Sequence, residues 1–324
     1  MCQASFRSVS GGVLFPQSLI LRGNPCRNLW GKRQEPDKEG SSCSRTRIPT
    51  LAISLLFAFA SVNLAAAHGQ GPPFHLIGAN QQYLTLGDSL AFGFQPNGDY
   101  THGYVDDLFQ ILQQEGVKAV ANMGCGGESS ITFIGGGCPS PIPPHFQYTG
   151  PQLTAAVNFL KANPGKVSIV TLDIGSNDVL RDTTITPSGC VINQPQFDTD
   201  LATLDANLTG TILPAIHKAL TPKGQVTDRI VMMNYYDPLQ NFCPNTVPFT
   251  QTLNQHLAAD VSGFGTIVDV FGAFGGAGVP NPNICTYTWF TLGCPTSTQP
   301  PDIHPTNLGY SVIANTFATA IPPD

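Results

Sequence analysis

Tyr83-Leu84-Thr85-Leu86-Gly87-Asp88-Ser89-Leu90 is the stretch that decides the fold of this chain. Apolar and β-branched residues run directly into a Gly-Asp-Ser turn, and residues that favour a helix resume near Tyr104. This pattern predicts a buried strand that ends in a tight turn. The turn presents Ser89 at the carboxyl end of the strand, where open α/β sheets bind their ligands. On this stretch alone Ser89 has two interpretations, a nucleophile or a serine that caps a helix.

Apolar runs alternate with amphipathic stretches along the rest of residues 68–324. Strands are predicted at residues 82–86, 117–121, 167–172, 229–234 and 266–270. Helices are predicted at residues 104–115, 152–161, 198–220, 245–260 and 307–320. Residues 133–150 and the stretch that carries Cys190 are expected to be loops. This alternation predicts an α/β domain whose mostly parallel five-stranded sheet is covered on both faces.

The first 67 residues differ in composition from the rest of the chain. Residues 1–47 carry eight Lys/Arg against three Asp/Glu, residues 51–64 are largely apolar, and Ala65-Ala66-Ala67 follows. A basic region, an apolar run of this length and small residues match a secretory signal peptide with cleavage after Ala67. A retained membrane anchor is the competing interpretation, but the run is short for a span of about 20 residues. Residues 1–67 are expected to be an upstream segment with a signal peptide, and residues 68–324 the folded domain.

The domain is acidic and long enough for a single core. Residues 68–324 carry 7 Lys/Arg and 18 Asp/Glu. So few cationic side chains argue against nucleic acid or an anionic membrane as a partner. We expect a secreted or periplasmic monomer that acts on a small-molecule or lipid ester, with no stable membrane insertion after the signal peptide is removed.

Six of the nine cysteines lie in the domain. An even number in an exported chain predicts three disulfides. Proximity along the chain favours the pairs Cys125–Cys138, Cys190–Cys243 and Cys285–Cys294. A metal site is the alternative, but the domain has no Cys-x-x-Cys and no His at ligand spacing beside a Cys.

Polar, glycine-containing blocks follow the first three predicted strands, and a fourth polar block precedes the last helix. Parallel strands end at one edge of a sheet, so these blocks can meet in space. Acyl transfer needs a nucleophile, a base, and donors aimed at the developing oxyanion. Ser89 supplies the hydroxyl, and His304 is the candidate base because imidazole titrates near neutral pH. The oxyanion donors would be the backbone N–H groups of Ser89 and Gly127 and the side-chain amide of Asn177.

These blocks resemble, in order, the four signature blocks of the SGNH (GDSL-type) esterase/lipase superfamily. In this chain they read Gly87-Asp88-Ser89-Leu90, Asn122…Gly127-Glu128-Ser129, Gly175-Ser176-Asn177-Asp178 and Asp302-Ile303-His304-Pro305. One block alone is a weak signal, whereas four in the right order are specific. The resemblance implies a flavodoxin-like three-layer α/β/α domain, with Ser89 as nucleophile and His304 as base. It also implies Ser89, Gly127 and Asn177 as oxyanion donors, and no metal or organic cofactor.

The histidine block departs from the family at one position. The family's usual acid lies three residues before the histidine, where this chain has Pro301. Asp302 lies two residues before His304, which in an extended segment places both side chains on the same side. The imidazole needs a partner that fixes its tautomer. Asp302 is the favoured candidate, and a backbone carbonyl of residues 299–302 is the alternative.

The sequence predicts an exported serine hydrolase that cleaves carboxylic esters, with a lipid or simple acyl ester as the leading substrate. A polysaccharide O-acetyl esterase is the alternative among enzymes, and a non-catalytic surface-binding protein is the alternative of a different class. Asp88 and Asp178 are interpreted as structural rather than catalytic. Two roles stay open for the aromatic residues of the Cys285–Cys294 loop, which would either line an acyl pocket near His304 or cap the core.

Overall fold

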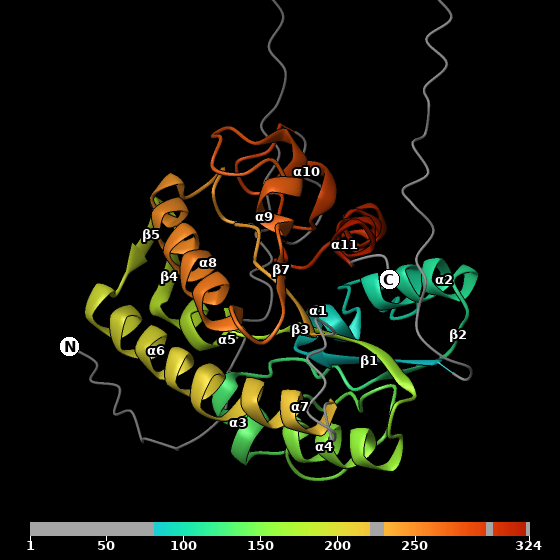
Figure 1. Ribbon diagram of the computed structural model, residues 1–324. Coiled ribbons are helices and arrows are strands. Elements are labelled where there is room, and N and C mark those ends of the chain that lie inside the picture. Colours follow the sequence, from blue (N-terminus) through green and yellow to red (C-terminus); the bar gives the residue numbers. More distant parts are fainter. Residues whose placement is uncertain (1–80, 221–229, 296–300, 322–324) are drawn as a thin grey trace, which may run out of the picture. The chain divides into compact units, whose positions relative to one another are not determined.

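The computed structural model of the chain describes residues 81–220, 230–295 and 301–321 (Figure 1). The predicted upstream segment and signal peptide, and the first residues of the predicted domain, lie outside the described residues. Five parallel strands form one sheet in the order β2-β1-β3-β6-β7. They are β1 (Gln81–Gly87), β2 (Val117–Asn122), β3 (Val167–Asp173), β6 (Ile230–Met233) and β7 (Thr266–Val268). The predicted five-stranded parallel sheet is confirmed.

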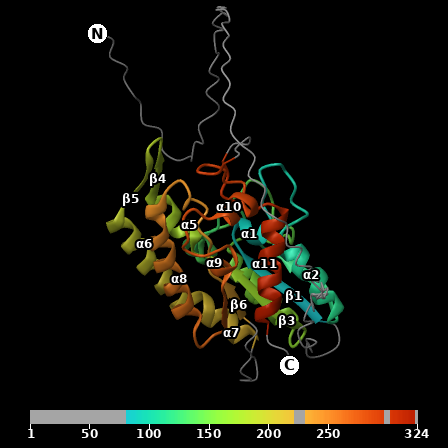
Figure 2. The ribbon, with the colours of Figure 1, turned by 90° about the horizontal axis from the view of Figure 1, so that it is seen from above.

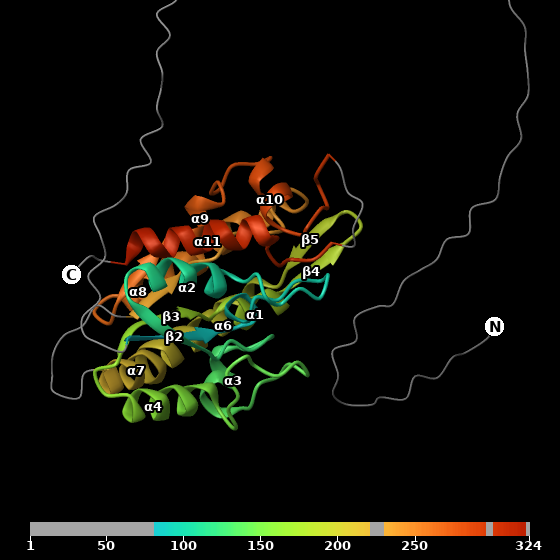
Figure 3. The ribbon, with the colours of Figure 1, turned by 90° about the vertical axis from the view of Figure 1, so that its right-hand side faces the viewer.

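Helices cover both faces of this sheet, so the domain has three layers (Figure 3). One face carries α2 and α11, which pack against each other, and the other carries α4 packed on α7 and α6 packed on α8. Their bounds are α2 (Tyr104–Gln114), α4 (Gln152–Ala162), α6 (Gln194–Asn207), α7 (Leu213–Leu220), α8 (Val247–Val261) and α11 (Asn307–Ala320). The flavodoxin-like three-layer α/β/α architecture is therefore confirmed.

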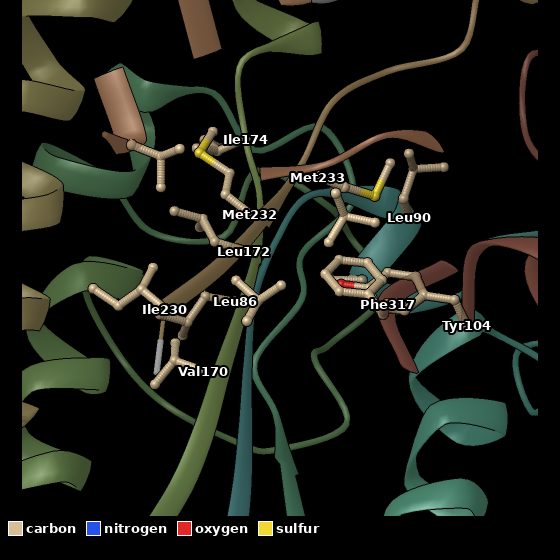
Figure 4. Packing of buried hydrophobic residues seen from close by; sticks show 14 of the residues in the cluster. Leu86, Leu90, Tyr104, Val170, Leu172, Ile174, Ile230, Met232, Met233 and Phe317 are labelled. Carbon is tan, nitrogen blue, oxygen red and sulfur yellow. The ribbon is translucent and has the colours of Figure 1, made fainter. Parts of the chain in front are cut away.

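The core lies between the sheet and each helical layer (Figure 4). Neighbouring strand residues point to opposite faces, as the pleat of a strand requires. Met232 accordingly lies beside Leu172, whereas Met233 lies on the side of Tyr104 and Phe317. The rings of Tyr104 in α2 and Phe317 in α11 stack at 5.0 Å and join these two helices. Both rings are fully buried.

Local sequence explains where α11 begins. The side chain of Thr306 accepts a hydrogen bond from Gly309 N at 3.2 Å, which is the usual bond of an N-cap threonine. Because α11 starts directly after this cap, the preceding histidine block is held at the edge of the sheet where the strands end.

Three segments differ from the sequence prediction. The predicted loop around Cys190 is a β-hairpin of β4 (Thr183–Thr186) and β5 (Gly189–Ile192), because β-branched residues flank a two-residue turn. Figure 2 shows this hairpin on the same side as α6 and α8. The predicted loop at residues 133–150 begins inside α3 (Ser130–Gly135), which Ser129 caps. The predicted helix at residues 198–220 begins earlier, with α6, and contains a π-helical turn at Leu208–Ile212.

All three predicted disulfides are present. Their Cα–Cα distances are 5.7 Å for Cys125–Cys138, 5.4 Å for Cys190–Cys243 and 5.7 Å for Cys285–Cys294. These lie in the usual range for disulfides. Across the described ranges, no helix is both long and apolar enough to cross a bilayer.

Candidate active site

Ser89 is the first residue of the short helix α1 (Ser89–Phe92), and only Asp88 separates it from the end of β1. Asp88 caps this helix, since its Oδ1 accepts a hydrogen bond from Leu90 N at 2.9 Å. Gly87 permits the tight turn, because its φ is +143° and a Cβ there would overlap the Asp173 carboxyl. The turn thus places the Ser89 hydroxyl at the edge where the strands end.

His304 connects Ser89 with Asp302. Its Nε2 lies 2.9 Å from Ser89 Oγ, and its Nδ1 lies 2.6 Å from Asp302 Oδ1. The same Oδ1 accepts a hydrogen bond from the backbone N–H of His304 at 3.0 Å, which bends the segment into an Asx-type turn. This turn explains how an acid two residues before the histidine reaches Nδ1. The contact is with the Asp302 side chain, the favoured of the two candidates.

The charge of Asp302 suits this contact. Burial raises the pKa of its carboxyl, but the hydrogen bonds with His304 and the charge of the imidazolium lower it further, so that it lies below the ordinary value. The carboxylate therefore stays ionised at neutral pH. As an acceptor it favours the tautomer with a proton on Nδ1, which leaves Nε2 free to accept a proton from Ser89.

The backbone around His304 pairs with the Cys285–Cys294 loop. Trp289 N donates to His304 O at 2.9 Å, and Asp302 N donates to Trp289 O at 3.2 Å. The Cys285–Cys294 disulfide closes this loop into a short covalent ring. The loop supports the histidine segment through these two hydrogen bonds.

Two aromatic side chains hold the histidine segment from other elements. Tyr236 OH donates a hydrogen bond to Ile303 O at 2.8 Å. The ring of Phe94 lies 4.5 Å from the His304 imidazole, between ring centroids. Both contacts restrict the position of the histidine segment.

Of the three candidate oxyanion donors, Asn177 is hydrogen-bonded to the residues next to the other two, Asp88 and Glu128. Among the described residues, the backbone N–H groups of Ser89 and Gly127 have no acceptor, and Gly127 adopts φ +78°. Asn177, in α5 (Ser176–Val179), differs because its Nδ2 donates to Glu128 O at 3.0 Å and to Asp88 Oδ2 at 3.3 Å. The amide is thus held beside Ser89, and the longer contact to Asp88 is the one that an oxyanion could replace.

Asp178 connects α5 with α3. Its carboxylate accepts hydrogen bonds from Ser130 N at 2.9 Å and from Ser130 Oγ at 2.5 Å. Burial raises its pKa above the ordinary value. These contacts brace the turn that carries Asn177, in line with the structural role expected for Asp178.

A group of buried acids lies beneath Ser89. Asp88 Oδ2 accepts a hydrogen bond from Tyr235 OH at 3.1 Å, and Asp88 N donates to Asp173 Oδ1 at 2.8 Å. Burial raises the pKa of Asp88 to about 6, and burial together with the Asp88 charge raises that of Asp173 well above its ordinary value. Burial also raises the pKa of Glu128 to about 7, although Gln152 Nε2 donates to it. Burial beneath Ser89 thus favours the protonated form of these three carboxyls.

The sequence profile of the GDSL-like Lipase/Acylhydrolase family matches residues 83–317 of the chain. The chain belongs to this family. It is therefore a carboxylic ester hydrolase by membership, in agreement with the resemblance of its four blocks. None of the curated proteins compared with the chain matches it.

Several solved structures are similar to this GDSL-like hydrolase. Axe2, an acetylxylan esterase from Geobacillus stearothermophilus, is 18% identical with a TM-score of 0.44 over 77% of this chain and 97% of its own. The lipase Lip_vut3 from a goat rumen metagenome is 16% identical with a TM-score of 0.46 over 74% of this chain and 97% of its own. The esterase EstA from Pseudoalteromonas sp. is 17% identical with a TM-score of 0.40 over 74% of this chain and 96% of its own.

A cavity of about 90 Å³ opens beside Ser89 in this GDSL-like domain. Ser89, Asn177 and His304 are among its polar lining residues. The rest is mostly apolar, and its lining includes Val179, Leu180, Phe197, Leu239, Phe249 and Leu253. Ser89 itself is among the residues that line the cavity. Over the described ranges, no group of three His, Cys, Asp or Glu side chains could hold a metal ion.

The aromatic residues of the Cys285–Cys294 loop do not line this cavity. Phe290 is buried in a small cluster with Leu239, and Tyr287 packs on the main core. Of the two open roles, capping the core is therefore the one that Tyr287 and Phe290 have, whereas Trp289 Nε1 donates to Gln95 Oε1 at 3.3 Å. Tyr235 and Phe94 are not among the residues that the sequence patterns single out. Tyr235 follows β6 and could have been found by inspecting the end of that strand, whereas nothing in the sequence marked Phe94.

Proposed function

We propose that this GDSL-like hydrolase is an exported serine esterase that forms an acyl-enzyme on Ser89. The proposal rests on the two contacts of the His304 ring, in which Nε2 lies 2.9 Å from Ser89 Oγ and Nδ1 lies 2.6 Å from Asp302 Oδ1. A nucleophile, a base and a group that orients the base are the parts that acyl transfer requires.

In the proposed reaction, Ser89 Oγ attacks the ester carbonyl while His304 Nε2 accepts its proton. Asp302 stays ionised and stabilises the imidazolium. The tetrahedral intermediate collapses as Nε2 gives the proton to the leaving alcohol. Water then attacks the acyl-enzyme in the same way, and the acid leaves with Ser89 regenerated.

The proposed oxyanion donors are Ser89 N, Gly127 N and Asn177 Nδ2. The two backbone groups have no acceptor within the described chain, so each is available to a ligand. Asn177 has to exchange its 3.3 Å contact with Asp88 for the oxyanion. Protonation of Asp88, whose pKa is about 6, weakens that contact and eases the exchange.

The proposed substrate has a short acyl chain. The cavity beside Ser89 has a volume of about 90 Å³. Its apolar lining favours an aliphatic chain over a polar one. A simple short-acyl ester fits this space better than a long-chain lipid.

Export is supported by two features. The three disulfides are typical of an oxidising compartment. The basic and apolar segments within residues 1–67 match a secretory signal. We therefore propose that residues 68–324 act outside the cytoplasm, as a monomer.

The test is hydrolysis of p-nitrophenyl esters from acetyl to palmitoyl by residues 68–324 in oxidised form, with Ser89→Ala as the matched control. Activity on the shortest chains that disappears in the variant supports the proposal. Labelling of Ser89 by a fluorophosphonate probe reports the nucleophile independently of the substrate. A folded protein that is neither labelled nor active would instead be the non-catalytic binding protein.

A further inference from the structure

The two backbone N–H groups of the proposed oxyanion hole come from separate loops. Ser89 follows β1 through the turn that begins at Gly87, whereas Gly127 lies in the loop after β2. Their N–H groups can serve one oxyanion only if the two loops keep a fixed separation. This inference rests on the proposed function, because it concerns the group that maintains that separation.

The side chain of Gln152 pairs with the backbone of Gly87. Gln152 is the first residue of α4, and it is only 1% exposed. Its Oε1 accepts a hydrogen bond from Gly87 N at 2.7 Å, and its Nε2 donates to Gly87 O at 3.0 Å. The amide therefore bonds both backbone polar groups of the residue at which the Ser89 turn begins.

The same amide also contacts the loop that carries Gly127. Gln152 Nε2 donates to Glu128 Oε2 at 3.1 Å, with Tyr148 OH as a more distant acceptor at 3.3 Å. Glu128 directly follows Gly127 and is fully buried. One side chain thus connects the start of the Ser89 turn with the residue next to the Gly127 donor.

The contact with Glu128 distinguishes Gln152 from an amide that only anchors a helix to the sheet. Asn254 of α8 makes the anchoring contacts alone, since its Oδ1 accepts from Tyr235 N and its Nδ2 donates to Tyr235 O, both at 2.8 Å. Gln152 makes the equivalent pair of bonds with Gly87 and adds the bond to Glu128. This added bond is not needed to hold α4 against β1.

We propose that Gln152 is a positioning residue of the esterase, which holds the Ser89 and Gly127 N–H groups at the separation that one oxyanion requires. Glu128 O also accepts the 3.0 Å bond of Asn177 Nδ2, so a displacement of Glu128 alters the third donor as well. Gln152 is not among the residues that line the cavity beside Ser89. It therefore acts through the two loops, and its loss should impair the transition state while ester binding stays intact.

The test is Gln152→Met, which keeps a side chain of similar length but removes both hydrogen-bonding groups of the amide. We expect kcat on a short-acyl p-nitrophenyl ester to fall about tenfold or more with little change in KM, because misplacing a catalytic group by about 1 Å can cost about a hundredfold. A second readout is the Ki of a short-chain trifluoromethyl ketone. Ser89 Oγ adds to its carbonyl carbon, the proton passes to His304, and the carbonyl oxygen becomes an oxyanion. Ki should rise by a factor similar to the loss of kcat.

Tyr83→Phe is the control for a general loss of stability. It removes the buried 2.7 Å hydrogen bond between Tyr83 OH and Thr171 Oγ1, which joins β1 to β3 away from both loops. This variant should unfold at a lower temperature and keep the kcat and Ki of the unmodified protein.

Glu128→Met breaks the connection from its other end. It leaves the bonds between Gln152 and Gly87 in place, so α4 stays anchored to the end of β1. We expect the same fall in kcat and rise in Ki, and this variant decides the question if Gln152→Met does not fold.

The remaining outcomes separate the two proposals. A folded Gln152→Met or Glu128→Met protein with unchanged kcat and Ki would overturn the positioning role, even if it unfolds at a lower temperature. A higher KM at unchanged kcat would overturn it too, since the amide would then serve ester binding. In both cases the unmodified protein still cleaves esters, so the positioning role fails alone. If the folded, unmodified protein is neither labelled by a fluorophosphonate nor active on any ester, the proposed function fails.

Discussion

Nδ2 of Asn177 lies 3.3 Å from Oδ2 of Asp88, the residue that directly precedes the nucleophile candidate Ser89. The same nitrogen lies 3.0 Å from Glu128 O. The shorter bond anchors the amide, and the longer one engages its second N–H with the Asp88 carboxylate. In the proposed reaction the oxyanion has to take the place of that carboxylate as the acceptor.

Removing that amide should slow the chemical step. Asn177→Ala is expected to lower kcat about a hundredfold, because the loss of one oxyanion donor typically costs roughly 3 kcal/mol of barrier. Asn177 is half-buried, so the midpoint of thermal unfolding should change little. The measurement is kcat on a short-acyl ester together with the unfolding temperature. A loss of only a few-fold would leave the oxyanion to the backbone N–H groups.

Asp302→Asn tests the partner of the histidine. The amide can still accept the backbone N–H of His304, but it can also donate to Nδ1, which favours the wrong tautomer. We expect kcat to fall roughly 10³- to 10⁴-fold, with an unchanged circular dichroism spectrum. A folded variant that keeps most of its activity would show that a backbone carbonyl orients the imidazole.

Glu128→Gln should change how stability depends on pH. An unfolded glutamate ionises near 4.5, whereas burial raises the pKa of Glu128 to about 7 in the folded chain. Between these values the folded chain holds a proton that the unfolded chain has lost, so stability falls as pH rises. The variant lacks this contribution, and its unfolding free energy should decline less between pH 4.5 and 7. Urea unfolding across that range measures the difference, and parallel curves for the two proteins would contradict the raised pKa.

Two disulfides should differ in what their removal affects. Chain entropy gives about 4 kcal/mol for the 53-residue separation of Cys190–Cys243 and about 2.5 kcal/mol for the 9-residue separation of Cys285–Cys294. The second pair closes the loop whose Trp289 supports His304. Replacing Cys190 and Cys243 by Ser should therefore lower stability more, and replacing Cys285 and Cys294 should lower kcat more. Urea unfolding and ester hydrolysis of both variants decide this, and the reverse order would refute the assignment.

Phe249→Ala should lengthen the preferred acyl chain. Phe249 and Phe197 meet edge to face at 5.0 Å and both line the cavity beside Ser89. Truncating one ring enlarges the space for the chain, so the optimum of a p-nitrophenyl ester series should move to longer acyl groups. Phe146→Ala is the matched control, because Phe146 contacts Phe159 and is not among the cavity-lining residues. An unchanged optimum in the Phe249 variant would place the acyl chain elsewhere.

The sheet and the positions of the candidate site residues could be predicted because local chemistry determines them. The apolar strand before Ser89 and the glycine at Gly87 leave few alternatives for the backbone, since Gly87 has φ +143° and no room for a Cβ. Asp302 could be predicted only as one of two candidates. The Asx-type turn that brings it to Nδ1 depends on a backbone bend that residue types alone do not specify.

Other features depend on packing between distant segments. Tyr235 contacts Asp88 across 147 residues of sequence, and Phe94 contacts His304 across an even longer separation. Hydrophobic periodicity in the sequence does not predict such contacts. The hairpin β4–β5 was missed for a different reason, because each of its strands is only four residues long. Strands that short give too few alternations to be told from a loop.

The Asx-type turn holds the Asp302 carboxylate and the His304 ring in a fixed relative position. One carboxylate oxygen is bonded both to the backbone and to the ring of the same histidine, so a displacement of this segment carries acid and base together. The coordinate that such a displacement alters is the separation of His304 from Ser89, which lie on different elements. Strain or a bound partner would thus regulate catalysis by changing the distance between His304 and Ser89. When that distance returned to its original value, the contact between Asp302 and His304 would already be in place.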